Sequence, residues 1–142
     1  MKLLGNNYRL WCETATPGTY AMILGQQSIS TSRAASTIDT STKDDFPYAT
    51  AAPGLFAYDV TLTGIATLPD TTGFTFVETK FKSQTPWNFQ IRKNGAAGVT
   101  ADAVFQCLCN ILELAPSYPQ NGTVPYTLKL VLSTAPTIDT LA

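Results

Sequence analysis

The residues of this sequence that could do chemistry are three cysteines, a pair of neighbouring aspartates and many hydroxyl side chains. The chain contains no histidine, which is the commonest general base and metal ligand in proteins. Asp44 and Asp45 lack the alternating acidic spacing of a calcium loop. None of the Ser and Thr hydroxyls has a base partner that can be recognised from the sequence. The sequence therefore predicts no enzyme, no cofactor and no metal site.

The cysteines are Cys12, Cys107 and Cys109, an odd number that cannot close completely into bridges within the chain. A zinc site would need further ligands, which a chain without histidine does not offer. Two interpretations stay open. The default is that the thiols are small, buried apolar side chains. The alternative is an inter-subunit disulfide involving these cysteines, formed if the protein ends up outside a cell.

Length and composition predict a single domain over residues 1–142 with an unusually neutral surface. Charged residues make up 13% of the chain, about half the usual share, and the net charge is −1. Such a balance leaves no electrostatic footprint for nucleic acid. The N-terminus lacks the apolar core of a signal peptide, and no apolar run approaches the length of a membrane helix. We therefore expect synthesis and folding in the cytoplasm.

Alternating apolar residues predict a mainly β fold. The clearest half-buried strand is Leu55–Leu68, in which Phe56, Tyr58, Val60 and Leu62 share one face. Further strands are expected at Tyr8–Glu13, Thr19–Ser32, Trp87–Lys93, Asp102–Leu114 and Val124–Ser133. The spacing of Phe74, Val77 and Phe81 favours one short helix over Phe74–Gln84. This pattern is typical of a β-sandwich or barrel.

A long polar segment lies between the second and third of these strands. Nine of the fifteen residues from Ser28 to Thr42 are Ser or Thr, and the segment shows no hydrophobic period after Ile29. Unstructured segments of this length inside a compact domain are usually either functional or disordered. Few charges and scattered apolar side chains favour a contact with another protein copy. A loop packed on its own domain remains the alternative.

The same segment resembles a known family. The run GQQSISTSRAASTIDTSTKDDF, followed by APGLFAYDVTLTGIA, is similar to the tail tube protein (major tail protein) of long-tailed bacteriophages. The matching positions are Gly25, Gln26, Ser28, Ser30, Ser32, Ile38, Asp39, Ser41, Lys43, Asp44 and Asp45, then Pro53, Gly54, Leu62 and Gly64. Weaker similarity extends over about Leu10 to Pro136.

The resemblance implies a fold, a function and a contact site. The fold would be two packed antiparallel sheets with one short flanking helix and a long loop between strands 2 and 3. Six copies would form rings that stack into a hollow virion tail tube, through which DNA passes as non-specific cargo. Other implied partners are the tape measure, the tail terminator and, in contractile tails, the sheath. The expected contact residues are Thr37, Ile38, Asp39, Thr40, Ser41, Thr42, Lys43, Asp44, Asp45, Phe46, Pro47 and Tyr48.

A second hypothesis comes from the aromatic residues alone. Trp11, Trp87 and Tyr118 are of the type that forms carbohydrate-binding platforms on β-sandwiches. Aromatic residues on strands are, however, more often part of a core. A carbohydrate- or receptor-binding module of a virion or secreted protein is thus the alternative to the tube subunit.

Overall fold

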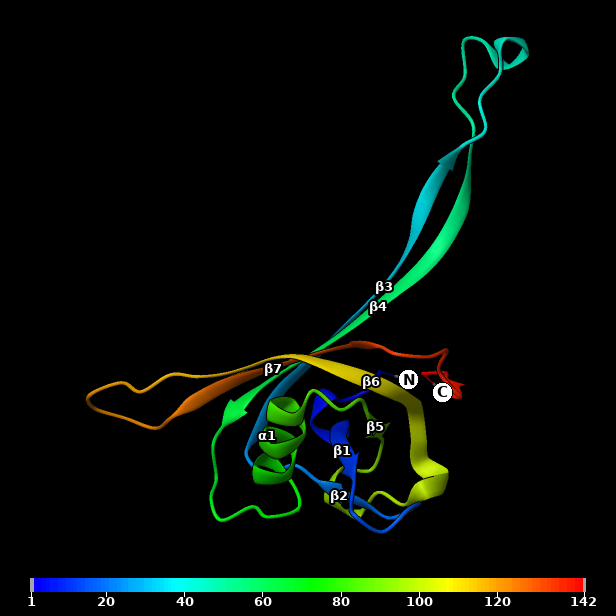
Figure 1. The fold of residues 1–142 in the computed structure, drawn as a ribbon. Helices are drawn as coiled ribbons and strands as arrows, with labels where there is room; N and C mark the ends of the chain where they lie inside the picture. The colour runs from blue at the N-terminus through cyan, green and yellow to red at the C-terminus, as the bar shows by residue number, and fades with distance from the viewer. Residues whose placement is uncertain (1, 142) are drawn as a thin grey trace.

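The computed structural model describes residues 2–141 as mainly β structure with one α-helix (Figure 1). The strands are β1 (Arg9–Glu13), β2 (Tyr20–Met22), β3 (Gln26–Asp39), β4 (Ala51–Ile65), β5 (Trp87–Arg92), β6 (Ala103–Pro116), β7 (Pro125–Leu132) and β8 (Ile138–Asp139), and the helix is α1 (Phe74–Ser83). The predicted fold class, antiparallel β structure with one flanking helix, is confirmed. The short β8, which pairs with β6, was not expected from the sequence.

The strands form one continuous antiparallel sheet rather than two, in the order β2-β1-β5-β6-β7-β4-β3. One half of the sheet contains β2, β1 and β5, and the other contains β7, β4 and β3. Strand β6 joins them, because it pairs with β5 through Ala103–Cys109 and with β7 through Cys109–Pro116. In Figure 1, β4, β6 and β7 form an upper layer over α1, β1, β2 and β5. The two halves of one sheet thus take the place of the two predicted sheets.

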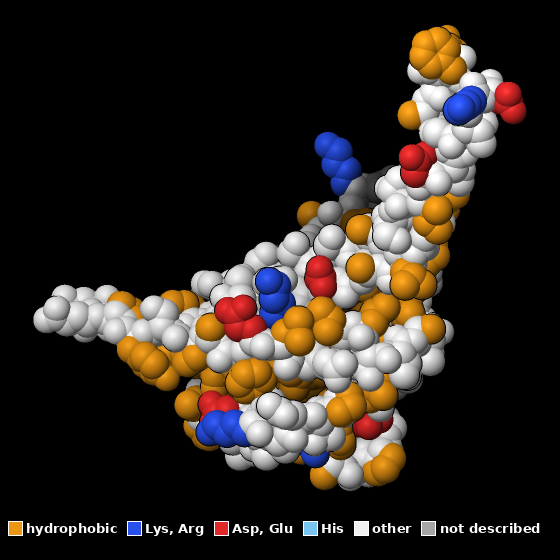
Figure 2. All heavy atoms as spheres, turned by 45° about the horizontal axis from the view of Figure 1, so that its top comes forward, with side chains coloured by type: hydrophobic (Ala, Val, Ile, Leu, Met, Phe, Trp, Pro, Cys, Tyr) orange, Lys and Arg blue, Asp and Glu red, His pale blue; other side chains and the backbone are white. Residues whose placement is uncertain are grey.

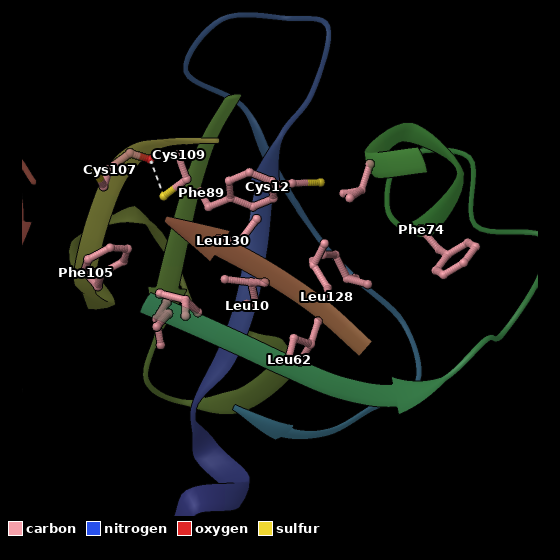
Figure 3. Close-up of a cluster of buried hydrophobic side chains, with 14 of the residues drawn as sticks. Leu10, Cys12, Leu62, Phe74, Phe89, Phe105, Cys107, Cys109, Leu128 and Leu130 are labelled. Atoms are coloured by element: carbon pink, nitrogen blue, oxygen red, sulfur yellow. Dashed lines mark hydrogen bonds between the residues drawn. The ribbon is translucent and has the colours of Figure 1, made fainter. Parts of the chain in front are cut away.

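The core lies between these layers (Figure 3). It takes Leu10 from β1, Phe89 from β5, Leu62 from β4 and Leu128 from β7, all at most 1% exposed. The predicted alternation is therefore correct in the inner part of β4 and along β7. Burying such side chains supplies the main driving force for folding.

Helix α1 begins where the sequence predicts, and the buried Asp70 fixes its start. One carboxylate oxygen of Asp70 accepts hydrogen bonds from the backbone N–H groups of Phe74, at 3.0 Å, and Leu24, at 3.1 Å. The same side chain thus caps the helix and ties it to the turn between β2 and β3. Phe74 then packs edge-on against Tyr126, with ring centroids 4.9 Å apart.

The predicted strand Thr19–Ser32 is two strands, because the chain turns at Gly25. Gly25 has φ of +76°, a conformation that glycine adopts without steric cost. A Cβ at this position would lie 2.0 Å from the carbonyl oxygen of Ile65. Glycine is thus required here both for the turn and for the close approach of β4. Within residues 2–141, no helix is long and apolar enough to cross a membrane.

Candidate functional site

The hairpin of β3 and β4 projects far beyond the body of the domain (Figure 1). The two strands pair from Gln26 and Gly64 out to Asp39 and Ala51. The inner half of β4 also pairs with β7, through Asp59–Ile65. The outer half has β3 as its only strand neighbour in the described chain. We call residues 33–58 the arm, and residues 40–50, which join its strands, the tip.

The arm corrects the prediction of a long loop between strands 2 and 3. Thr37, Ile38 and Asp39, expected in that loop, are the last residues of β3, and β4 already begins at Ala51. The prediction missed these strand residues because alternation reveals a strand only where one face is buried. Both faces of the arm are exposed, so Ser, Thr and Ala form strands there without a hydrophobic period.

The tip holds its shape through its own hydrogen bonds. Thr42 and Asp45 form a capping box around a short 3-10 turn, Lys43–Asp45. The hydroxyl of Ser41 accepts a hydrogen bond from the Thr50 backbone N–H at 2.7 Å, which closes the base of the tip. A 2.9 Å hydrogen bond from the Ser41 N–H to Asp39 lowers the pKa of that exposed carboxyl. The tip is thus ordered before it meets any partner, which reduces the entropy cost of binding.

The arm exposes apolar side chains along its length and at its tip, where Figure 2 shows a hydrophobic cluster. Phe46 is 87% exposed and Tyr48 is 78% exposed. Leu55 and Phe56, on β4 between the tip and the body, are similarly open to solvent. The alternative in which this segment packs on its own domain is therefore wrong. An isolated two-stranded hairpin is marginal in water, so an arm with these exposed apolar side chains is suited to burial against partners.

A polar cluster fixes the base of the arm to the C-terminal strand. The carboxylate of Asp139 on β8 accepts a hydrogen bond from the Tyr58 hydroxyl, which raises the pKa of Tyr58. The same carboxylate lies 3.2 Å from the guanidinium of Arg33. Because Tyr58 belongs to β4 and Arg33 to β3, both strands are held where they leave the domain. This cluster could not be predicted from the sequence, because its members are far apart in the chain.

The second candidate surface is the outer face of the four strands β6, β7, β4 and β3. Their inward side chains fill the core, so the alternate side chains form an uncovered face, which Figure 2 shows with few charges. We call this the hydroxyl face. Its hydroxyl-bearing and charged members, read from the strand register, are Ser28, Ser30, Ser32, Asp59, Thr61, Thr63, Glu113, Thr127 and Lys129. The alternation of Ser28, Ser30 and Ser32 could have indicated this face, but it was not predicted from the sequence.

The electrostatics of the hydroxyl face are weak and slightly acidic. It carries two carboxylates, Asp59 and Glu113, and one ammonium group, Lys129. Lys129 stands in register between Thr61 and Glu113, so a carboxylate flanks its positive charge. Affinity for nucleic-acid phosphates depends on clustered Lys and Arg. This face therefore offers little to hold a phosphate backbone.

All three cysteine thiols are buried and free in the folded chain, at most 1% exposed. Burial, reinforced by the nearby Asp70 charge, raises the pKa of Cys12 to about 12. Burial also raises the pKa of Cys107 and of Cys109. These positions favour the interpretation as apolar core side chains. An inter-subunit disulfide would require a sulfur to leave the core.

The aromatic residues of the carbohydrate hypothesis do not form a common platform. Trp11 is 9% exposed, and the guanidinium of Arg92 lies 4.4 Å from its ring centroid. The ammonium of Lys80 covers the ring of Trp87 at 4.0 Å. Only Tyr118 of the three is exposed. The two tryptophans thus serve internal packing. Among residues 2–141, no three Cys, Asp or Glu side chains gather as metal ligands.

The profile of the family described as phage tail tube protein matches residues 5–137. The chain belongs to the phage tail tube protein family. The match includes the whole arm and the hydroxyl face, and it confirms the family that the sequence resembles. A comparison with curated proteins finds no match.

Solved structures share the tail tube fold at low sequence identity. A chain from the tail of an empty GTA particle, refined with C6 symmetry, matches with a TM-score of 0.81 and 16% identity, over 96% of this chain and 98% of that chain. A chain of the SPP1 tail tube matches with a TM-score of 0.76 and 15% identity, over 99% of this chain and 83% of that chain. A chain of the six-fold symmetrised anti-feeding prophage baseplate matches with a TM-score of 0.70 and 11% identity, over 97% of this chain and 97% of that chain. At these identities, the comparisons establish the fold.

Proposed function

We propose that this chain is a structural, non-catalytic subunit that forms six-membered rings, which stack into a hollow tail tube. DNA would pass through the lumen during infection without being recognised. One observation carries the proposal above the others: the arm exposes apolar side chains along its length and at its tip, away from its own core. In a family of tail tube proteins, the partner that supplies the missing contacts is most simply another copy.

The arm supports stacking as well as ring formation. It reaches beyond the body of the domain, so its tip can contact a copy that the body does not touch. Two of the similar structures have six-fold symmetry, which supports the ring number. The proposed contact residues keep the range expected from the sequence, Thr37–Tyr48, with Leu55 and Phe56 added because the structure exposes them.

The hydroxyl face supports the assignment of the lumen. A surface that conducts DNA should not hold phosphates, and this face has one more carboxylate than ammonium groups. The opposite faces of the same strands are buried in the core, so they cannot line a channel. We place Thr61, Thr63 and Lys129 on the wall of the lumen.

The proposal places the whole chain, as a single domain, in the virion tail after synthesis in the host cytoplasm. Both ends of the tube would meet other tail proteins. The expected partners are the tape measure, the tail terminator and, in a contractile tail, the sheath. These partners rest on the family.

Shortening the hairpin tests this function. Residues 40–50 are replaced by Asn-Gly, a dipeptide that closes two-residue hairpins, because Asp39 and Ala51 are paired strand neighbours. We expect the variant to fold like the wild type and to remain monomeric at concentrations at which the wild type forms tubes in electron micrographs. Tubes of normal appearance from the shortened variant would contradict the role of the tip. A wild-type protein that stays monomeric at every concentration would contradict the function itself.

A further inference from the structure

A groove on the far side of the domain from the arm has the chemistry to receive the tip. It has a volume of about 530 Å³ and lies between the end of α1 and the outer edge of β6. Its walls are Lys80, Phe81, Lys82, Gln84, Thr85, Asn110, Ile111 and Leu112. No carboxylate is among these residues. The groove therefore combines an apolar floor with two positive charges.

A β-bulge turns Leu112 into this groove. The pairing of β6 with β7 passes from Ile111 directly to Glu113, so Leu112 is the extra residue without a partner. Bulges of this kind bend a strand and re-aim a side chain. The side chain of Leu112 is 58% exposed, although the residue lies in a sheet strand. The bulge thus interrupts the sheet and presents an apolar side chain to solvent.

The edge of β6 is also open beside the groove. Strand β5 covers β6 only as far as Cys109, so Asn110–Leu112 have no strand on that side within the described chain. An open strand edge is a ready surface for another chain. The groove therefore offers an apolar floor, two ammonium groups and unpaired backbone in one place.

The tip of the arm carries the complementary features. Phe46 and Tyr48 are its exposed aromatic side chains. Asp44 and Asp45 against the single Lys43 give the tip a net charge of −1, from two carboxylates and one ammonium group. Asp45 is engaged in the capping box, whereas Asp44 is exposed. Asp44 is thus the carboxylate best placed to meet a partner's ammonium group.

We infer that the tip of one copy binds the groove between α1 and β6 of a second copy, with Phe46 and Tyr48 against Phe81 and Leu112. Asp44 faces Lys82 of that copy. The occupant must be a second copy, because the arm leaves the domain on the side away from α1 (Figure 1). The inference rests on the proposed assembly function and adds to it the surface that accepts the tip.

The charges within the groove favour Lys82 as the contact. The ammonium of Lys80 is already placed over the ring of Trp87. The side chain of Lys82 is 73% exposed, and its only ion-pair partner within the described chain is Glu78, one helical turn earlier and 3.2 Å away. An exposed pair of this kind is weak, so Lys82 is free to pair with an incoming carboxylate.

A second cavity of the domain is a poorer acceptor. It has a volume of about 340 Å³ and lies between the N-terminal segment, β3 and β4. Its basic side chains are Arg9 and Arg33, and Arg33 is already paired with Asp139. The carboxylate of Asp139 would oppose an acidic tip. The crosslinking experiment below therefore compares this cavity with the groove as the site that receives the tip.

A charge exchange tests the contact. Asp44→Lys and Lys82→Asp are each expected to raise the critical concentration for tube formation about tenfold or more, because each places like charges in contact. The double variant is expected to return to within about threefold of the wild type. Lys2→Asp, at an exposed lysine outside the groove, is the matched control and should change nothing. Single variants that assemble like the wild type, or a double variant that is not rescued, would overturn the inference.

Crosslinking distinguishes the two cavities. Tyr48→Cys combined with Leu112→Cys should give a ladder of covalent multimers when assembled protein is oxidised, whereas Tyr48→Cys combined with Asn6→Cys should not. The native thiols are buried, so they add little background. A ladder from the Asn6 pair alone would place the tip in the other cavity. Either ladder forms only if the protein assembles. A ladder from the Asn6 pair alone would thus overturn the proposed contact and leave the proposed assembly function intact.

Discussion

Removing the two aromatic side chains of the tip should uncouple assembly from folding. In the single chain, Phe46 and Tyr48 are 87% and 78% exposed. Fully burying such a side chain contributes about 1.5–3 kcal/mol. An open groove leaves part of each ring in water, so we expect roughly two thirds of the full burial energy of the two side chains. This amounts to about 2–4 kcal/mol for the pair. The double variant Phe46→Ala, Tyr48→Ala should lose this amount for each subunit added.

This loss has a measurable size. At about 1.4 kcal/mol for each tenfold change in an equilibrium constant, the critical concentration should rise about 30- to 700-fold. The free energy of unfolding of the monomer should change by less than about 0.5 kcal/mol, since the removed side chains make few contacts in the single chain. Sedimentation of polymer over a concentration series gives the first quantity, and urea unfolding below the critical concentration gives the second.

A core substitution provides the contrast. Leu128→Ala, at a position 1% exposed, should lower the free energy of unfolding by about 2–5 kcal/mol through lost burial and a cavity. If the double tip variant assembled at the wild-type concentration, the tip would not be a buried contact and the reasoning would be refuted. If it lost several kcal/mol of monomer stability, the exposure described here would be wrong.

The remaining predictions concern the domain itself. Asp70→Ala should lower the free energy of unfolding by about 2–3 kcal/mol in urea titrations, because the backbone N–H groups of Leu24 and Phe74 lose a charged acceptor; an unchanged midpoint would show that water replaces the carboxylate. The three thiols should not react with an aromatic disulfide reagent at pH 8 until the protein is unfolded, when three equivalents of the aromatic thiolate should be released. A thiol that reacts fast in the folded protein would contradict their burial. Alkali should destabilise the fold, because burial raises the pKa of both Cys12 and Tyr126 to about 12. These neutral groups contribute stability fully below about pH 9 and lose it as pH rises toward 12, so the urea midpoint should fall between pH 9 and 11; a flat profile would oppose this.

The elements that the sequence predicted well are those with one buried face. The inner part of β4 and all of β7 alternate between core and solvent, and so Val60, Leu62 and Leu128 were recognisable as inward residues. Helix α1 was predicted from the spacing of Phe74 and Val77, both of which are buried. In each case, the periodicity of the pattern follows directly from the geometry of the element.

The parts that could not be predicted depend on contacts between distant residues or between copies. The outer halves of β3 and β4 lack a buried face in the single chain, so a strand there looks like a polar loop. The bulge at Leu112 interrupts a run of apolar residues without any glycine to mark it. The contact of Asp139 with Tyr58 joins residues 81 positions apart. The contact range Thr37–Tyr48 came from the family resemblance, and it stays a prediction.

The central claim is that copies of this chain build a hollow tube through the arm, with the hydroxyl face inward. The most direct measurement is an electron cryo-microscopy reconstruction of the purified protein assembled at high concentration. We expect six-fold rings, Thr61 and Lys129 on the wall of an open lumen, and every tip buried against another copy. A tube with these side chains on its outer surface, or with tips free in solvent, would contradict it.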